Sequence, residues 1–462
     1  MPIILVTFAY FLGFAGFLSF VNFLLSYYYD NNENYYIFIV SAVIMFSIGI
    51  GLILSFKDNI IKLSPSTNLI SIVVIWFFMP IVLMIPIYKI LDISMISSYF
   101  EAVSMLTTTG YTSIEQGTSL SKSLILWYST LQWYGGFLTI FFAVSVINFY
   151  QHINLNSAPN YHVSDVKNIK LYHIIKTISY TYLSLTLICI IVLLALGMSF
   201  YESVVITLST ISTGGFLPNT LLISDNLILT VLSVFMIFGM INLYYIKELK
   251  LSDFLNILIH KYVLFMYALF IIINVLDNQY YISIIDKIAR NLFLYISIIT
   301  TTGFEMKNIN NNIPTIVIIT LVFIGGFYGS TSGGIKIDRL IEMMKIASRE
   351  LSLLIRPNLV FSEKHERDNK IASLYWAYFF TYILAFVIIA LVLSLNEITF
   401  EQSLIVAAAT ITNSGNIILN NLDSNLLISF DDKYKLFLSF SMILGRLEIL
   451  ALIGCIMSIN RK

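Results

Sequence analysis

Long uncharged apolar runs dominate the chain, and short polar segments separate them. Two runs, at 3–28 and 35–56, flank the polar turn Asp30-Asn31-Asn32-Glu33-Asn34 and predict a helical hairpin. Later runs predict pairs of helices at 68–90 and 122–149, 172–197 and 222–248, 260–276 and 313–345, and 371–395 and 434–459. Runs of about 20 apolar residues can cross the hydrocarbon layer of a bilayer as helices. The pattern therefore predicts an all-α integral membrane protein.

A shorter apolar stretch lies between the helices of each pair, at 97–109, 200–213, 284–301 and 399–413. Each stretch ends in hydroxyl residues and glycine: Thr107-Thr108-Thr109-Gly110, Ser212-Thr213-Gly214-Gly215, Thr300-Thr301-Thr302-Gly303 and Thr412-Asn413-Ser414-Gly415. These stretches are too short to span a bilayer, so we interpret each as a re-entrant half-helix. We expect an N-terminal hairpin (1–60) and four pseudo-fourfold repeats (61–155, 156–250, 251–356 and 357–462) of helix, half-helix, filter loop and helix around a central pore.

The repeated step suits a monovalent cation. A half-helix that enters from outside directs the negative end of its dipole at the pore centre, and backbone carbonyls can replace the hydration shell of the ion. Carboxylates, which divalent cations prefer, are absent from the steps. The alternative is close helix packing through small residues. The fourfold recurrence favours a pore, and a second glycine set (Gly135, Gly239, Gly325, Gly445) is expected to pack behind the filter. The predicted ion-binding residues are Thr108, Thr109, Gly110, Thr213, Gly214, Gly215, Thr301, Thr302, Gly303, Asn413, Ser414 and Gly415.

The third repeat alone contains a glycine-rich break, Gly325-Gly326-Phe327-Tyr328-Gly329-Ser330-Thr331-Ser332-Gly333-Gly334. Each glycine costs a helix about 1 kcal/mol relative to alanine, so the break predicts a loop at membrane depth. We expect this loop to obstruct the inner pore, with a packing kink as the alternative. The predicted gate residues are Gly325, Gly326, Gly329, Ser330, Thr331, Ser332, Gly333, Gly334, Lys336 and Arg446.

Arg446 is the only basic residue predicted deep in a span, and Glu448 is taken as the only deep acid. An intramembrane charge indicates function. We expect Arg446 to raise the barrier to cations beneath the filter. The alternative is a structural salt bridge with Glu448, although residues two apart lie on different helix faces.

Composition and charge indicate a membrane protein and predict its orientation. The chain is 58% hydrophobic and 11% charged, which is too apolar for a water-soluble protein. Most of its 26 Lys and Arg residues lie on the side predicted to hold both termini, which is therefore expected to be cytoplasmic. On that side, a charged amphipathic helix is predicted within 336–370, ending at Pro357.

Several motifs carry a family resemblance: the four steps above, Gln132-Trp133-Tyr134-Gly135-Gly136, the segment 325–336, and Gly445-Arg446-Leu447-Glu448. In this order they resemble the Trk/Ktr/HKT superfamily of potassium uptake proteins, and within it the ion-translocating subunit of bacterial Trk systems. The resemblance implies K⁺ at Gly110, Gly215, Gly303 and Gly415. It also implies a homodimer with one pore per subunit, a pore role for Arg446, and a cytoplasmic nucleotide-binding regulatory subunit, TrkA-like, that docks on the charged helix.

Two positions depart from a simple match to the family. Gly215 is chosen over Gly214 because an aromatic residue follows it, as at Gly110 and Gly303. Asn416 follows Gly415 where the family commonly has proline, so the resemblance does not extend to the local loop geometry there.

The expected function is potassium uptake across the cytoplasmic (inner) membrane, with K⁺ as the transported ion. No organic cofactor, nucleic-acid partner or enzymatic activity is expected of this chain. A sodium-permeable or sodium/proton-coupled cation transporter of the same fold stays open, as does channel-like conduction against symport. A secondary transporter of another solute and an intramembrane enzyme are weaker alternatives, because the chain offers no constellation of residues for either.

Overall fold

The computed structural model describes residues 2–30, 34–56, 65–114, 120–152, 171–216, 225–243, 284–304, 315–356, 364–396, 398–415 and 430–447. Every regular element in these ranges is a helix. The predicted helix at 260–276 and the last part of 434–459 lie outside the described residues.

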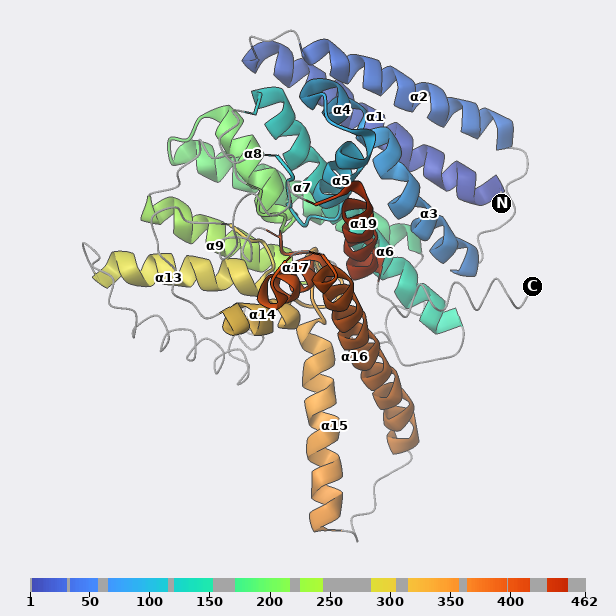
Figure 1. The fold of residues 1–462 in the computed structure, drawn as a ribbon, viewed down its shortest axis with the longest axis vertical. Coiled ribbons are helices and arrows are strands. Elements are labelled where there is room, and N and C mark those ends of the chain that lie inside the picture. Colours follow the sequence, from blue (N-terminus) through green and yellow to red (C-terminus); the bar gives the residue numbers. More distant parts are fainter. Residues whose placement is uncertain are drawn as a thin grey trace.

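The chain begins with two long helices that lie side by side at one edge of the molecule, α1 (Pro2–Tyr29) and α2 (Tyr35–Phe56) (Figure 1). The Ser19 hydroxyl group donates to the Phe38 carbonyl at 2.8 Å and joins the two helices. Asn22 of α1 donates to the Thr130 hydroxyl of α6 at 2.8 Å and ties the hairpin to the body. The hairpin predicted at 3–28 and 35–56 is confirmed.

Seven further helices account for six of the predicted long helices. They are α3 (Pro65–Leu83), which continues after Met84 as α4 (Ile85–Leu91), then α6 (Lys122–His152), α7 (Leu171–Ala195), α9 (Asn226–Met240), α16 (Lys364–Ser394) and α19 (Asp432–Leu447). By length and composition, five segments in the described ranges can cross a membrane: Pro2–Tyr29, Tyr35–Phe56, Ile70–Leu91, Ile175–Ala195 and Tyr375–Ser394.

Four short helices end near the centre of the molecule: α5 (Met95–Leu106), α8 (Phe200–Ile211), α13 (Ile284–Ile299) and α17 (Phe400–Thr412) (Figure 1). Hydroxyl residues start three of them, because an N-cap oxygen satisfies backbone N–H groups that the first turn leaves unpaired. Ser94 caps α5, while Ser199 with Glu202 and Thr399 with Gln402 form capping boxes on α8 and α17. Short helices are present at the four positions where half-helices are predicted from the sequence.

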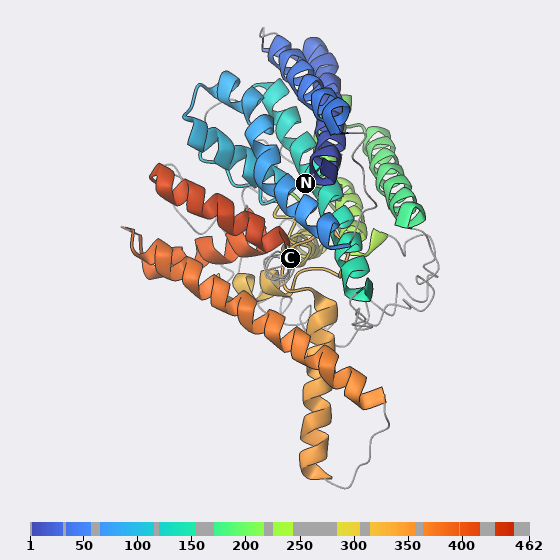
Figure 2. The ribbon, with the colours of Figure 1, turned by 90° about the vertical axis from the view of Figure 1, so that its right-hand side faces the viewer.

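The helix predicted at 313–345 is interrupted by a loop, as predicted. Helix α14 (Thr315–Ile324) ends before the glycine-rich loop, and α15 (Ile337–Ile355) follows it. Figures 1 and 2 show α15 projecting beyond the rest of the molecule, with the charged start of α16 nearby. Near its tip, the Leu354 and Ile355 side chains are 80% and 78% exposed.

The distribution of polarity is the inverse of that in a water-soluble domain. Large apolar side chains of α1, α2, α7 and α16 are exposed, whereas hydroxyl groups of the four half-helices are buried. Ser98, Ser104, Thr210, Ser297 and Thr410 are all fully buried. This arrangement is that of a membrane protein with a polar interior.

Candidate ion pathway

One backbone turn recurs at the end of every half-helix. Thr108, Thr213, Thr301 and Asn413 adopt left-handed conformations with φ of 56°, 53°, 57° and 53°. For threonine this conformation costs about 1–2 kcal/mol, whereas asparagine adopts it more readily. Four such residues at equivalent positions are held by the surrounding structure, and strain of this kind concentrates at functional sites.

A glycine lies two positions after each of these four left-handed residues. Gly110, Gly215 and Gly303 have positive φ of 78°, 67° and 85°. Gly214 does not share that conformation, and its carbonyl instead accepts a hydrogen bond from Gln132 Nε2 at 2.8 Å. By backbone geometry, Gly215 is therefore the equivalent of Gly110 and Gly303.

The fourth step differs from the other three. Gly415 lacks a positive φ, and its backbone N–H donates to the Thr109 carbonyl at 2.8 Å. This bond joins the first and fourth steps directly. The second and third steps also adjoin, because a Cβ atom on Gly215 would lie 1.6 Å from the Thr302 carbonyl oxygen. The turns therefore meet in two pairs, and all four are buried.

Paired hydroxyl groups brace three of the turns. Thr107 and Thr109 lie 2.8 Å apart at their hydroxyl oxygens, as do Thr300 and Thr302, and Thr412 and Ser414 are 2.6 Å apart. The second step has glycine at the later position, so Ser212 bonds only to helix carbonyls. Thr108 has a buried hydroxyl group with no hydrogen-bond partner among the described residues.

Three glycines of the second set permit close packing, as predicted. A Cβ atom would lie 1.6 Å from the Leu106 carbonyl oxygen at Gly135, 3.2 Å from that of Ile211 at Gly239, and 2.3 Å from that of Ile411 at Gly445. Glycine therefore brings α6, α9 and α19 against the ends of three half-helices. Gly325 meets Gly333 of its own loop instead.

The glycine-rich loop folds back on itself between α14 and α15. Backbone N–H groups of Ile335 and Lys336 donate to the carbonyls of Phe323 and Ile324 at 2.8 and 3.1 Å. The whole loop from Gly325 to Lys336 is buried. Its start is also fixed to α9, because the Phe327 N–H donates to the Met240 carbonyl at 3.0 Å.

The loop contacts the ends of three half-helices. The Thr331 hydroxyl group donates to the carbonyls of Ile211, at 3.3 Å, and Gly239, at 3.0 Å. The Gly333 N–H donates to the Thr301 hydroxyl oxygen at 2.7 Å, and a Cβ atom on Gly333 would lie 1.7 Å from the Thr412 carbonyl oxygen. The loop therefore lies directly against the second, third and fourth steps.

Arg446 connects the loop to the first step. Its side chain is 5% exposed, and it donates from Nε to the Thr107 carbonyl at 2.5 Å and from Nη1 to the Thr331 carbonyl at 2.6 Å. Glu448, the alternative partner, lies outside the described residues. A second cation is close by, since the Lys336 ammonium group donates to the Ser330 hydroxyl at 3.3 Å and to the Ser332 carbonyl.

The loop is also joined to the start of α15. The Tyr328 N–H donates to Asp338 Oδ2 at 2.8 Å. The Arg339 guanidinium group lies over the rings of Tyr328 and Tyr378 of α16, at 5.2 and 4.0 Å from their centroids. Movement of α15 would therefore act on the loop through these contacts.

Sequence reasoning missed one deep acid. Glu101 is fully buried in α5, so the expectation that Glu448 is the only deep acidic residue is wrong. A comparison among the four half-helices would have found it. At the same distance from the step glycine, the other three carry Ile206, Leu294 and Val406.

Comparison with known proteins places this geometry in a family. The family model TrkH, described as a cation transport protein, matches residues 36–248 and 242–457. The Trk system potassium uptake protein TrkH of Vibrio parahaemolyticus is 28% identical over 397 residues, 78% of this chain and 79% of that protein. The Trk system potassium uptake protein TrkG of Escherichia coli K12 is 28% identical over 453 residues, 90% of each chain.

The fold agrees with these matches. The crystal structure of the potassium transporter TrkH from Vibrio parahaemolyticus superposes with a TM-score of 0.81 at 23% identity, covering 98% of this chain and 97% of that one. The prediction of a membrane transporter rather than an enzyme is confirmed by the family match. The chain belongs to the TrkH family of cation transport proteins.

Proposed function

We propose that the chain takes up potassium ions across the cytoplasmic membrane through a pore lined by the four steps Thr108–Gly110, Thr213–Gly215, Thr301–Gly303 and Asn413–Gly415. The observation that carries this proposal is the same strained turn at the end of four buried half-helices. The names of the relatives, which are potassium uptake proteins, support K⁺ as the ion.

The proposed architecture is an N-terminal hairpin followed by four repeats around the pore. Each half-helix directs its carbonyl end, equivalent to about half a negative charge, toward the steps. Carbonyl oxygens near Gly110, Gly215, Gly303 and Gly415 would replace the hydration shell of K⁺. The steps hold no carboxylate, so a monovalent cation is favoured over a divalent one.

In this proposal the loop 325–334 and Arg446 form the gate. The loop lies against the second, third and fourth steps, and Arg446 joins it to the first step. A guanidinium group and the Lys336 ammonium group below a cation filter raise the electrostatic barrier to a cation. These contacts support a closed state, and opening requires the loop and Arg446 to separate.

Regulation would come from the cytoplasmic side. With both termini in the cytoplasm, α15 projects there and offers a surface to a nucleotide-binding regulatory subunit of the TrkA type. The contacts of Tyr328 with Asp338 and Arg339 support transmission from α15 to the loop. The proposed assembly is a homodimer with one pore per subunit, and the exposed apolar faces of α2 and α16 suit contact with lipid or the second subunit.

Flux measurements test the function. The purified chain is placed in liposomes without a partner, and potassium and sodium fluxes are measured in competition. Potassium-selective flux is the expected result, either with the wild type or with a variant whose loop 325–334 is shortened. A loop-shortened variant that passes neither ion would contradict the proposal, and a preference for sodium would favour the sodium-permeable alternative.

A further inference from the structure

Glu101 is an acid in a position where the other half-helices have none. Its side chain is fully buried in α5, and the equivalent residues Ile206, Leu294 and Val406 are buried and aliphatic. Packing of a half-helix therefore does not require a carboxyl group there. Burying a carboxyl group is costly unless hydrogen bonds compensate it, so its presence calls for a specific reason.

The carboxyl group holds the chain segment that leaves the first step. Glu101 Oε1 accepts from the Ser113 N–H at 2.5 Å, from the Ser113 hydroxyl group at 2.9 Å and from the Thr112 hydroxyl group at 3.3 Å. These two residues follow Gly110 and Tyr111 directly. Donors gathered on one oxygen suit a group that only accepts, as an ionised carboxylate does. The rigid helix α5 is thereby clamped to the exit of its own filter turn.

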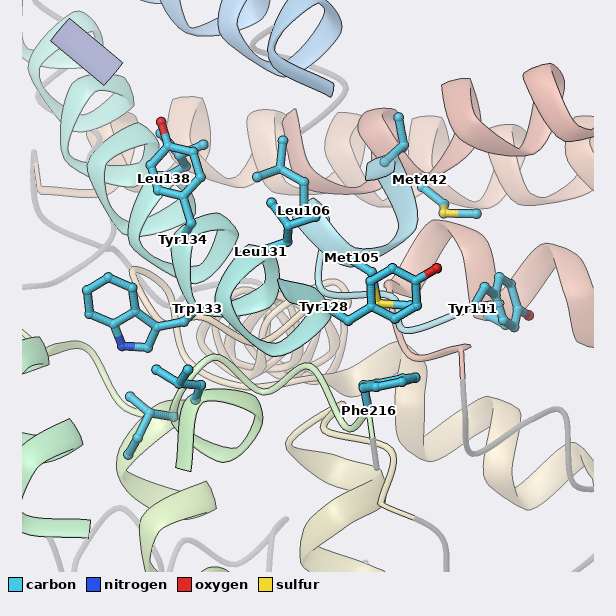
Figure 3. Close-up of a cluster of buried hydrophobic side chains, with 14 of the residues drawn as sticks. Met105, Leu106, Tyr111, Tyr128, Leu131, Trp133, Tyr134, Leu138, Phe216 and Met442 are labelled. Atoms are coloured by element: carbon cyan, nitrogen blue, oxygen red, sulfur yellow. The ribbon is translucent and has the colours of Figure 1, made fainter. Parts of the chain in front are cut away.

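The second oxygen extends the clamp toward the next repeat. The Tyr128 hydroxyl group of α6 lies 3.1 Å from Glu101 Oε2. The Tyr128 ring packs edge to face on Phe216, with centroids 5.3 Å apart, and Phe216 directly follows Gly215 (Figure 3). Glu101 thus links the residues after the first and second filter glycines through one tyrosine.

We propose that Glu101 is a positioning residue that sets the cation selectivity of the pore by fixing the exits of the first and second filter steps. The proposal rests on the proposed potassium function. In a filter made of backbone carbonyls, discrimination depends on where those oxygens are held. If the anchor is lost, the first quarter of the filter can relax around ions of different size.

Replacement by the residue type of another half-helix is the direct test. Glu101→Leu gives α5 the side chain that α13 carries at Leu294, and the ratio of potassium to sodium flux is measured in competition in liposomes containing the full chain. We expect this ratio to fall about tenfold, the factor that corresponds to one net hydrogen bond to a charged group. Glu101→Gln keeps an acceptor for Ser113, so its flux ratio is expected to lie between those of the wild type and Glu101→Leu.

A matched control separates selectivity from a general effect of removing an acid. Glu401 is an exposed glutamate in the first turn of α17, and Glu401→Gln is expected to keep the wild-type ratio. A folded Glu101→Leu variant with the wild-type flux ratio would overturn the proposal.

Milder variants decide the question if Glu101→Leu does not fold. Tyr128→Phe and Ser113→Ala each remove one hydroxyl group and leave the carboxyl group in place, and each is expected to lower the flux ratio about threefold. Wild-type ratios in both would refute the inference. If the wild type itself prefers another monovalent cation, the potassium function fails, whereas a changed ratio in these variants still supports the role of Glu101.

Discussion

The four steps depend on residues in conformations that their side chains disfavour. Thr108, Thr213 and Thr301 together store about 3–6 kcal/mol of left-handed strain, which the packed half-helices must offset, whereas Asn413 adopts this conformation more readily. The glycines at 110, 215 and 303 reach positive φ without that cost. Substitution at these glycines is therefore expected to affect the filter before it affects the overall fold.

Gly110→Ser is expected to lower the preference for potassium over sodium. Serine at a φ of 78° strains the first step, and its side chain adds an oxygen beside the ion path. The measurement is competitive flux in liposomes. Gly13→Ser in α1 is the matched control, because a Cβ atom there meets nothing within 4 Å. If Gly110→Ser shows the same competition between potassium and sodium flux as the wild type, Gly110 is not part of the filter.

Arg446→Ala is expected to increase cation flux while selectivity changes little. The substitution removes the two hydrogen bonds that Arg446 donates to the Thr107 and Thr331 carbonyls. It also removes a buried positive charge from the proposed ion path. Initial flux rates at equal protein levels are the measurement. Arg446→Lys keeps the charge but cannot form the same fork, so an intermediate rate is expected. Unchanged flux in the alanine variant would count against a gate role.

At the scale of elements, Thr331 is one of the residues that fix the loop between α14 and α15 to its neighbours. Thr331→Ala removes the hydroxyl bonds to the Ile211 and Gly239 carbonyls. The two carbonyls share the single hydroxyl proton, so at about 1 kcal/mol for this shared bond the closed state should lose about fivefold in population relative to an open one. We expect a higher flux in liposomes. Thr320→Ala, which removes an exposed hydroxyl group on α14, is the control and should match the wild type.

The helices, half-helices and loop break could be predicted because local pattern decides them. Apolar length defines the spans, N-cap hydroxyls start three half-helices, and the density of glycine ends α14. The same pattern gives no sign that Thr108 is left-handed, because threonine disfavours that conformation and only the tertiary structure imposes it.

The hydrogen-bond partners that lie far apart in the sequence also could not be predicted. Arg446 and Thr107 are 339 residues apart, and Arg446 and Thr331 are 115 apart, so their contacts follow from the assembly of the helices. The buried position of Glu101 was not predicted, for a related reason. Hydropathy marks α5 as a short apolar helix, whereas the donors that stabilise its carboxyl group come from residues 113 and 128.

For the whole molecule, the predicted orientation can be tested by labelling. In a background without Cys189 and Cys455, Leu354→Cys at the tip of α15 should react with an impermeant maleimide only from the cytoplasmic side. Asp225→Cys, at the exposed N-cap of α9, should react only from outside. The opposite pattern would reverse the orientation, and with it the proposed place of the regulatory subunit.

The glycine-rich loop belongs to one quarter of the molecule. A channel made of four identical subunits has four moving parts, and its opening steepness can reflect cooperation among them. Here a single segment contacts the second, third and fourth steps directly and is linked to the first step by Arg446. We therefore expect opening within one pore to be a single all-or-none event, without graded subconductance levels. Any sigmoidal response to an effector would then originate in the proposed regulatory partner or in coupling between the two pores of the proposed dimer.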